Sequence, residues 1–212
     1  MDKRGNERLK GGIIKFLTIS GDLIVLNLLW LICSIPIITI GPTTNALFGV
    51  CLKIVEDEET SVIKSFFAIF KANFKQTLIV GVFSIFVIIT LYADINYILS
   101  IEGNIQKVFI VVTILVLALL LTMIPYVNCL IVKYNNSLKG HIINALKLAF
   151  VSPVQTILMW LILLTPLLML LFIQPIILLY LGGLILMFVF SLPVYLCAKI
   201  VNDVFKKIEA KR

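Results

Sequence analysis

The chain has 212 residues, of which 61% are hydrophobic and 14% are charged, whereas an ordinary soluble domain is about 45–50% apolar and about 25% charged. This composition excludes a soluble fold, because too few polar side chains remain to cover its surface. A net charge of +7 would suggest a nucleic-acid partner in a soluble protein. In a membrane protein, however, Lys and Arg collect on cytoplasmic loops, so we expect no nucleic acid.

Apolar blocks of membrane-spanning length, about 17–25 residues, recur along the chain and predict an all-α polytopic membrane protein. We expect a single membrane domain (1–212) with about six membrane helices in a bundle and two amphipathic helices at its cytoplasmic side. The expected segments are a basic cytoplasmic N-terminus (1–15), a helical hairpin (16–55), an amphipathic helix (60–75), spans at 76–99 and 108–133, a second amphipathic helix (137–151), spans at 153–173 and 176–199, and a basic cytoplasmic tail (200–212).

The first span contains an acidic residue, Asp22, about two turns after Lys15. An ionisable residue inside a span is by default a functional hypothesis. In one interpretation the carboxylate lies near the cytoplasmic interface, where it snorkels or pairs with a lysine such as Lys53. In the other, Asp22, Asn27 and Asn45 line a polar seam that binds a proton, a cation or a sugar hydroxyl.

A proline- and glycine-containing stretch, SIPIITIGPTTNALF at 34–48, interrupts the first apolar block. Both prolines lack an amide hydrogen and disfavour helix in the residue before them, and glycine accepts backbone angles that other residues resist. Gly41 and Pro42 suit the N-cap and the first position of a returning helix. We therefore predict a turn whose candidate residues are Pro36, Thr39, Gly41, Pro42 and Asn45. Residues 43–55 give about 20 Å of helix against a hydrocarbon core of about 30 Å, so the pattern does not decide whether this helix spans the membrane or is re-entrant.

The distribution of basic residues depends on this turn. If the chain turns back there, seventeen of the eighteen Lys and Arg residues face the cytoplasm and only Lys107 lies outside. Without the turn, most cations would be exported, against the usual excess of Lys and Arg on cytoplasmic loops. We expect a multi-pass protein with both termini in the cytoplasm.

The segment SVIKSFFAIFKANFKQ at 61–76 places aromatic residues on one helical stripe with lysines beside it. This pattern indicates a helix in the membrane interface, with rings in the acyl boundary and ammonium groups toward the phosphates of an anionic inner leaflet. A groove on a soluble partner is the alternative. The candidate interfacial residues are Phe66, Phe67, Phe70, Lys71, Phe74 and Lys75.

A weaker copy of this amphipathic pattern follows at 137–151. Three segments at the ends of helices expected to return to the cytoplasm also resemble one another: VCLKIVEDE, NCLIVKYNN and LCAKIVNDV. We infer an approximate repeat of a returning helix, an interfacial helix and an outgoing helix.

No catalytic or metal-binding motif is present. The chain contains no Walker loop, HExxH or GxSxG sequence, and its four cysteines form no CxxC pair, so neither a zinc site nor a disulfide framework is indicated. We expect no cofactor and no catalytic residue.

The sequence NLLWLICSIPIITIGPTTNAL, followed by SFFAIFKANFKQ, resembles the YesL family of uncharacterised bacterial membrane proteins. Trp30, Pro36, Thr39, Gly41 and Pro42, and then the Phe/Lys segment ending at Gln76, carry the resemblance, which covers most of the first hundred residues. Members often have Ala where this chain has Thr44 or Asn45. Because the family is commonly encoded near carbohydrate-uptake genes, the resemblance implies a bacterial cell membrane location and a role alongside sugar import, and it implies no reaction.

These observations favour a non-enzymatic accessory of carbohydrate uptake or utilisation that acts through a transporter complex or through lipid. The alternative is a small secondary transporter or channel with a broken-helix site near Asp22. An intramembrane enzyme is a third interpretation, without named residues.

Overall fold

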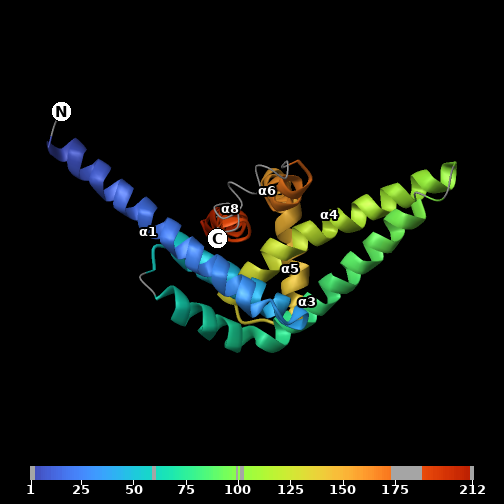
Figure 1. The fold of residues 1–212 in the computed structure, drawn as a ribbon, viewed down its shortest axis with the longest axis horizontal. Helices are drawn as coiled ribbons and strands as arrows, with labels where there is room; N and C mark the ends of the chain where they lie inside the picture. Colours follow the sequence, from blue (N-terminus) through green and yellow to red (C-terminus); the bar gives the residue numbers. More distant parts are fainter. Residues whose placement is uncertain (1–2, 59–60, 99, 101–102, 173–187, 211–212) are drawn as a thin grey trace.

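The computed structural model describes residues 3–58, 61–98, 100, 103–172 and 188–210 of the chain. These residues are almost entirely helical and include no strand. In chain order the elements are α1 (Lys3–Cys33), the 3₁₀ helix η1 (Ile37–Thr39), α2 (Ile40–Val55), α3 (Val62–Ile98), α4 (Asn104–Lys133), α5 (Leu138–Val151), α6 (Pro153–Phe172) and α8 (Ser191–Glu209), as Figure 1 shows.

Four of the described segments are long and apolar enough to cross a membrane: Gly12–Cys33, Ile37–Val55, Val62–Ile98 and Ile105–Lys133. A fifth is added if Leu138–Val151 and Pro153–Pro166, which meet at 107°, count as one broken span. The all-α membrane architecture thus agrees with the prediction at the level of four to five spans. The predicted span 176–199 lies partly outside the described residues, and its last part belongs to α8.

The first two helices form an antiparallel hairpin. The Lys15 Nζ lies 2.6 Å from Asp57 Oδ1, directly after α2, and Trp30 Nε1 donates to Thr44 Oγ1 at 3.1 Å. The middle of α1 therefore meets the end of α2, and residues near the end of α1 meet the start of α2. The chain turns back between them, as the sequence predicted.

Helix α2 lies at the centre of the protein. Eleven of its residues, Gly41–Thr43 and Asn45–Leu52, are buried, and α3, α4 and α8 pack around it. The hydrophobic core is built on Leu47, Phe48 and Val50 of this helix, each no more than 1% exposed. A helix that is apolar on nearly all sides requires this central position.

Helix α3 joins two segments that we expected to be separate, the amphipathic helix at 60–75 and the span at 76–99. It is one continuous helix of 37 residues, whose ribbon changes direction along its length in Figure 1. The segment contains no proline, so no backbone hydrogen bond is lost where the sequence changes from amphipathic to apolar.

The second amphipathic helix, α5, is separate from α6. Ser152 between them has φ −132° and ψ 64°, outside the helical region, because it precedes Pro153. The sole histidine, His141, is buried on α5.

Beyond Gly81, α3 pairs with the first part of α4 to form an arm that extends away from the other helices (Figure 1). We call residues 82–98 and 105–119 the α3–α4 arm. Its side chains are largely apolar and exposed, with Phe86 at 66% and Leu115 at 63%. Such a hairpin is suited to contact with lipid or with another membrane protein.

Candidate functional site

The turn is held by threonine hydroxyls. Thr39 Oγ1 lies 2.6 Å from both Cys33 O and Pro36 O, and Thr43 Oγ1 donates to Thr39 O at 2.7 Å with Cys33 O 3.2 Å away. The last carbonyls of a helix have no partner within the helix, so these two side chains close the end of α1. The returning helix begins at Ile40, which places Pro42 third in the helix instead of first, still within the turn where a missing N–H costs no hydrogen bond.

Gly41 has a different role from the one we expected. We predicted that it adopts backbone angles unavailable to other residues, but its φ is not positive. Instead, α2 crosses α3 at this point, and a Cβ on Gly41 would collide with Thr77 O and approach Gly81 Cα to 2.7 Å. A Cβ on Gly81 would in turn lie 2.6 Å from Gly41 Cα. The two glycines allow direct backbone contact between the helices.

Asn45 joins three helices. Its Nδ2 donates to Asn128 O at 3.1 Å and to Asn128 Oδ1 at 3.2 Å, and its Oδ1 accepts from Asn73 Nδ2 at 3.1 Å. Asn45 is fully buried and Asn128 is 5% exposed. These side chains connect α2, α3 and α4 inside the protein, where amide groups without partners would be costly.

The predicted polar seam of Asp22, Asn27 and Asn45 is not assembled as one lined cavity. Asn27 is fully buried, and its Oδ1 accepts from the backbone N–H groups of Phe190 and Ser191, each at 3.1 Å, at the start of α8. It therefore caps that helix from outside. Asp22 is partly exposed on α1, and the ion pairs among the described residues do not include it.

The aromatic stripe of α3 faces the protein more than we expected. Phe66 is fully buried, and Phe70 packs against the core, whereas Phe67 is 40% exposed. The rings of Phe66 and Phe70 stack with centroids 6.5 Å apart, and those of Phe70 and Phe74 meet edge to face at 5.4 Å. The stripe thus packs the first half of α3 against the core around α2. The sequence pattern alone does not distinguish this packing from burial of the rings in lipid.

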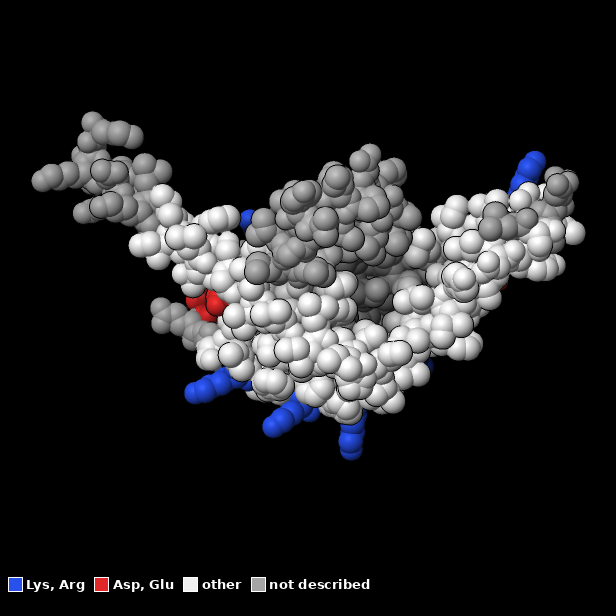
Figure 2. Space-filling model, viewed as in Figure 1, with Lys and Arg blue, Asp and Glu red and all other residues white. Residues whose placement is uncertain are grey.

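The lysines of this segment point outward. Lys64, Lys71 and Lys75 are exposed and define the basic face of α3. Figure 2 shows basic side chains projecting along the edge of the molecule that carries the first half of α3, and another at the tip of the α3–α4 arm. Lys107 lies in the first turns of α4, at that tip. This separation is the one expected from the predicted charge asymmetry.

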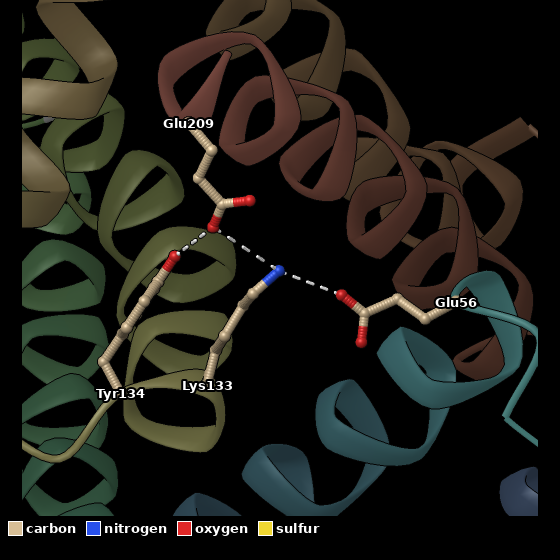
Figure 3. A network of polar contacts seen from close by, with 4 residues as sticks. All are labelled: Glu56, Lys133, Tyr134 and Glu209. Carbon is tan, nitrogen blue, oxygen red and sulfur yellow. Dashed lines mark hydrogen bonds and ion pairs between the residues drawn. The ribbon is translucent and has the colours of Figure 1, made fainter. Parts of the chain in front are cut away.

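A polar network connects the C-terminal ends of α2, α4 and α8 (Figure 3). Lys133 Nζ lies 3.0 Å from Glu56 Oε1 and 4.0 Å from Glu209 Oε1, and Tyr134 OH donates to Glu209 Oε1 at 2.9 Å. Lys133 also lies 5.2 Å from the ring centre of Phe205. Glu56 lies within the segment VCLKIVEDE and Lys133 within NCLIVKYNN, whereas Glu209 follows the third similar segment, LCAKIVNDV, by five residues.

The cysteines of the same three segments gather beneath this network. Cys51, Cys129 and Cys197 are fully buried and near enough to interact electrostatically. All are free thiols. Within the described part of the chain, no three His, Cys, Asp or Glu side chains are arranged to hold a metal ion.

Two hollows lie beside α3. One, of about 460 Å³, lies between Lys71–Gln76 and the loop after α4, and the other, of about 470 Å³, lies between α3, α4 and α5. Neither is lined by Asp22, Asn27 or Asn45. Six residues of the YesL-like segment, Lys71–Gln76, line the first hollow, and one of them, Asn73, is bonded to Asn45.

Residues 23–95 match the model of a family described as protein of unknown function, DUF624. That family includes YesL-type proteins, so the resemblance holds at the level of the family model across this region, and the match does not single out YesL. The matched residues contain the turn, the Gly41–Gly81 crossing, Asn45, Asn73 and the basic face of α3. No curated protein and no solved structure matches the chain.

Sequence reasoning did not identify Asn73, Gly81, Lys133, Glu56 or Glu209 as contact residues. Spacing offered a signal for Gly81 only, since a glycine within an apolar helix often marks close helix packing. Asn73 was hidden within an amphipathic pattern, and the ion-pair network joins residues up to 77 positions apart, for which a single sequence carries no pairing information.

Proposed function

We propose that this protein is a non-enzymatic accessory of carbohydrate uptake or utilisation in the bacterial cell membrane, acting by contact with a transporter or with lipid. The link to carbohydrate rests on the YesL resemblance. The cytoplasmic placement of its termini rests on the charge asymmetry, and its location in the bacterial cell membrane rests on the apolar helices together with the resemblance. The contact mode rests on the packing described above.

The observation that carries the proposal is that the buried side-chain amides of Asn27 and Asn45 form hydrogen bonds with other parts of the protein. A carrier of this size needs ligand groups at a water-accessible site near the bilayer midplane. Here the Oδ1 of Asn27 accepts from the start of α8, and the side chain of Asn45 is bonded to Asn73 and Asn128. These amides stabilise the helix bundle instead of facing a solute.

The outer surface offers two features for contact. The basic face of α3 is suited to phosphate groups of the inner leaflet, and the α3–α4 arm presents apolar side chains away from the core. Two packed helices that leave the bundle in this way have surface available for another membrane protein. We therefore assign partner contact to the arm.

Affinity purification of the full-length chain after mild solubilisation, from its host growing on complex carbohydrates, tests the proposal. We expect subunits of a carbohydrate transporter to be recovered with it. The double variant Phe86→Ala/Leu115→Ala, on the arm, should lose them. The matched control Ile13→Ala/Phe16→Ala, which changes residues 60% and 70% exposed on α1, should retain them.

A protein that emerges alone from several detergents would contradict an accessory role. Solute flux into liposomes that contain only this protein would also contradict it, and would instead favour the carrier or channel. Both measurements use the intact chain in a membrane environment, so neither depends on isolating a part of it.

A further inference from the structure

The two hollows beside α3 follow one another along the helix. Lys71, Lys75 and Gln76 line the polar hollow together with Tyr134 and Asn136. One turn later on α3, Ile79 lines the apolar hollow, and two residues after Asn136, Leu138 does so too. The hydrogen bond from Gln76 Nε2 to Asn136 O, 3.2 Å long, joins α3 to the loop that follows α4.

The polar hollow is chemically suited to an anion. Two lysines line it and no Asp or Glu does, and the ion pairs between described residues leave Lys71 and Lys75 uninvolved. Tyr134, Asn135 and Asn136 supply further polar groups on the opposite wall. An anionic lipid headgroup near a membrane surface is attracted by each nearby Lys.

The apolar hollow is suited to a hydrocarbon chain. Its walls are aliphatic and aromatic side chains such as Phe83, Met123 and Ile142. Ser84 is the polar residue in the wall, and its hydroxyl donates to Val80 O of its own helix at 2.8 Å, so it offers little to a polar ligand. The volume of each hollow falls in the range of about 300–1,000 Å³ that is usual for ligand pockets.

We propose that the two hollows form one binding site for an anionic phospholipid of the inner leaflet, with the phosphate beside Lys71 and Lys75 and an acyl chain between α3, α4 and α5. A free phosphate would leave the apolar hollow unused, and a neutral lipid would leave both lysines without a counter-ion. Only an amphiphile with a negative headgroup complements both halves. This inference rests on the membrane placement in the proposed function and names the lipid class that the protein recognises.

Titration of the purified full-length chain, stripped of lipid in detergent and followed by native mass spectrometry, tests the site. The probes are long-chain phosphatidylglycerol, long-chain phosphatidylcholine, short-chain phosphatidylglycerol and inorganic phosphate. We expect phosphatidylglycerol to bind at least tenfold more tightly than phosphatidylcholine, and the long-chain form more tightly than the short-chain form. Inorganic phosphate should bind far more weakly than either phosphatidylglycerol.

Two sets of variants separate the halves of the site. Lys71→Gln/Lys75→Gln should weaken phosphatidylglycerol binding about tenfold to thirtyfold, while the charge-matched control Lys206→Gln/Lys207→Gln, on exposed positions of α8 outside both hollows, should change it less than threefold. Ser84→Phe fills the apolar hollow and should reduce the preference for long chains. Circular dichroism confirms that each variant is folded before it is titrated.

Equal binding of the two long-chain lipids, or equal losses in both lysine pairs, would overturn a defined site. Inorganic phosphate binding as tightly as the lipid, with no effect of Ser84→Phe, would reassign the polar hollow to a free anion. Because lipid titration uses the purified protein and co-purification uses cells, failure of this inference can be told apart from failure of the accessory role.

Discussion

At the scale of single residues, the structure turns candidate ligand groups into helix connectors. The sequence singled out Asn45 as an amide inside an apolar hairpin. Its side chain forms hydrogen bonds with Asn73 on α3 and with Asn128 on α4 at the same time, which explains its position. Asn27 does the same for the first backbone N–H groups of α8. Polar residues in membrane helices commonly serve such interhelical bonds.

We predict that Asn45→Ala lowers the free energy of unfolding by about 1–2 kcal/mol, because it leaves buried groups of Asn73 and Asn128 without a partner. The matched control is Asn96→Ala on the exposed end of α3, where Asn96 bonds only to Tyr92 O one turn back, and where we expect a change below about 0.5 kcal/mol. Thermal unfolding in detergent measures both. Equal stabilities for the two variants would contradict the role of Asn45 as a connector.

At the scale of helices, the crossing of α2 and α3 sets the shape of the first half of the chain. We predict that Gly41→Ala and Gly81→Ala each destabilise the protein by about 1–3 kcal/mol, since the added methyl meets backbone of the other helix and no side chain can move aside. Gly21→Ala on α1, where a Cβ would meet nothing within 4 Å, should leave stability unchanged or raise it by up to about 1 kcal/mol. Unfolding in detergent compares the three variants, and a loss at Gly21 as large as at Gly41 would show that the crossing is not the cause.

Much of this element-level structure is readable from the sequence. Pro36 lies between α1 and α2, where the chain reverses, whereas Gly41 and Pro42 lie in the first turn of α2. Pro153 separates α5 from α6 because it disturbs the residue before it. The continuity of α3 could have been read from the absence of proline between Val62 and Ile98, yet the change from amphipathic to apolar pattern suggested two elements. Burial of Phe66 could not be predicted, because an aromatic stripe has the same periodicity whether it faces lipid or another helix.

At the scale of the whole molecule, we propose that the hairpin of α1 and α2 determines the side of the membrane on which every later segment lies. Lys15 meets Asp57 at its open end, and Lys133 and Glu209 lie near Glu56 at the same end of α2. Lys107 lies at the opposite end of α4 from Lys133. On this proposal, one reversal near residue 36 accounts for the distribution of the basic residues. The repeat inferred from the sequence stays a prediction, because α3 is one continuous helix whereas α5 and α6 meet at 107°.

Cysteine labelling in intact cells tests the reversal most directly. Single cysteines at positions 64, 107 and 139, in a variant whose Cys33 is replaced by Ser, are exposed to a membrane-impermeant maleimide before and after permeabilisation. The account predicts that Lys107→Cys is labelled in intact cells and that Lys64→Cys and Lys139→Cys are labelled only after permeabilisation. Labelling of position 64 or 139 from the outside would contradict it.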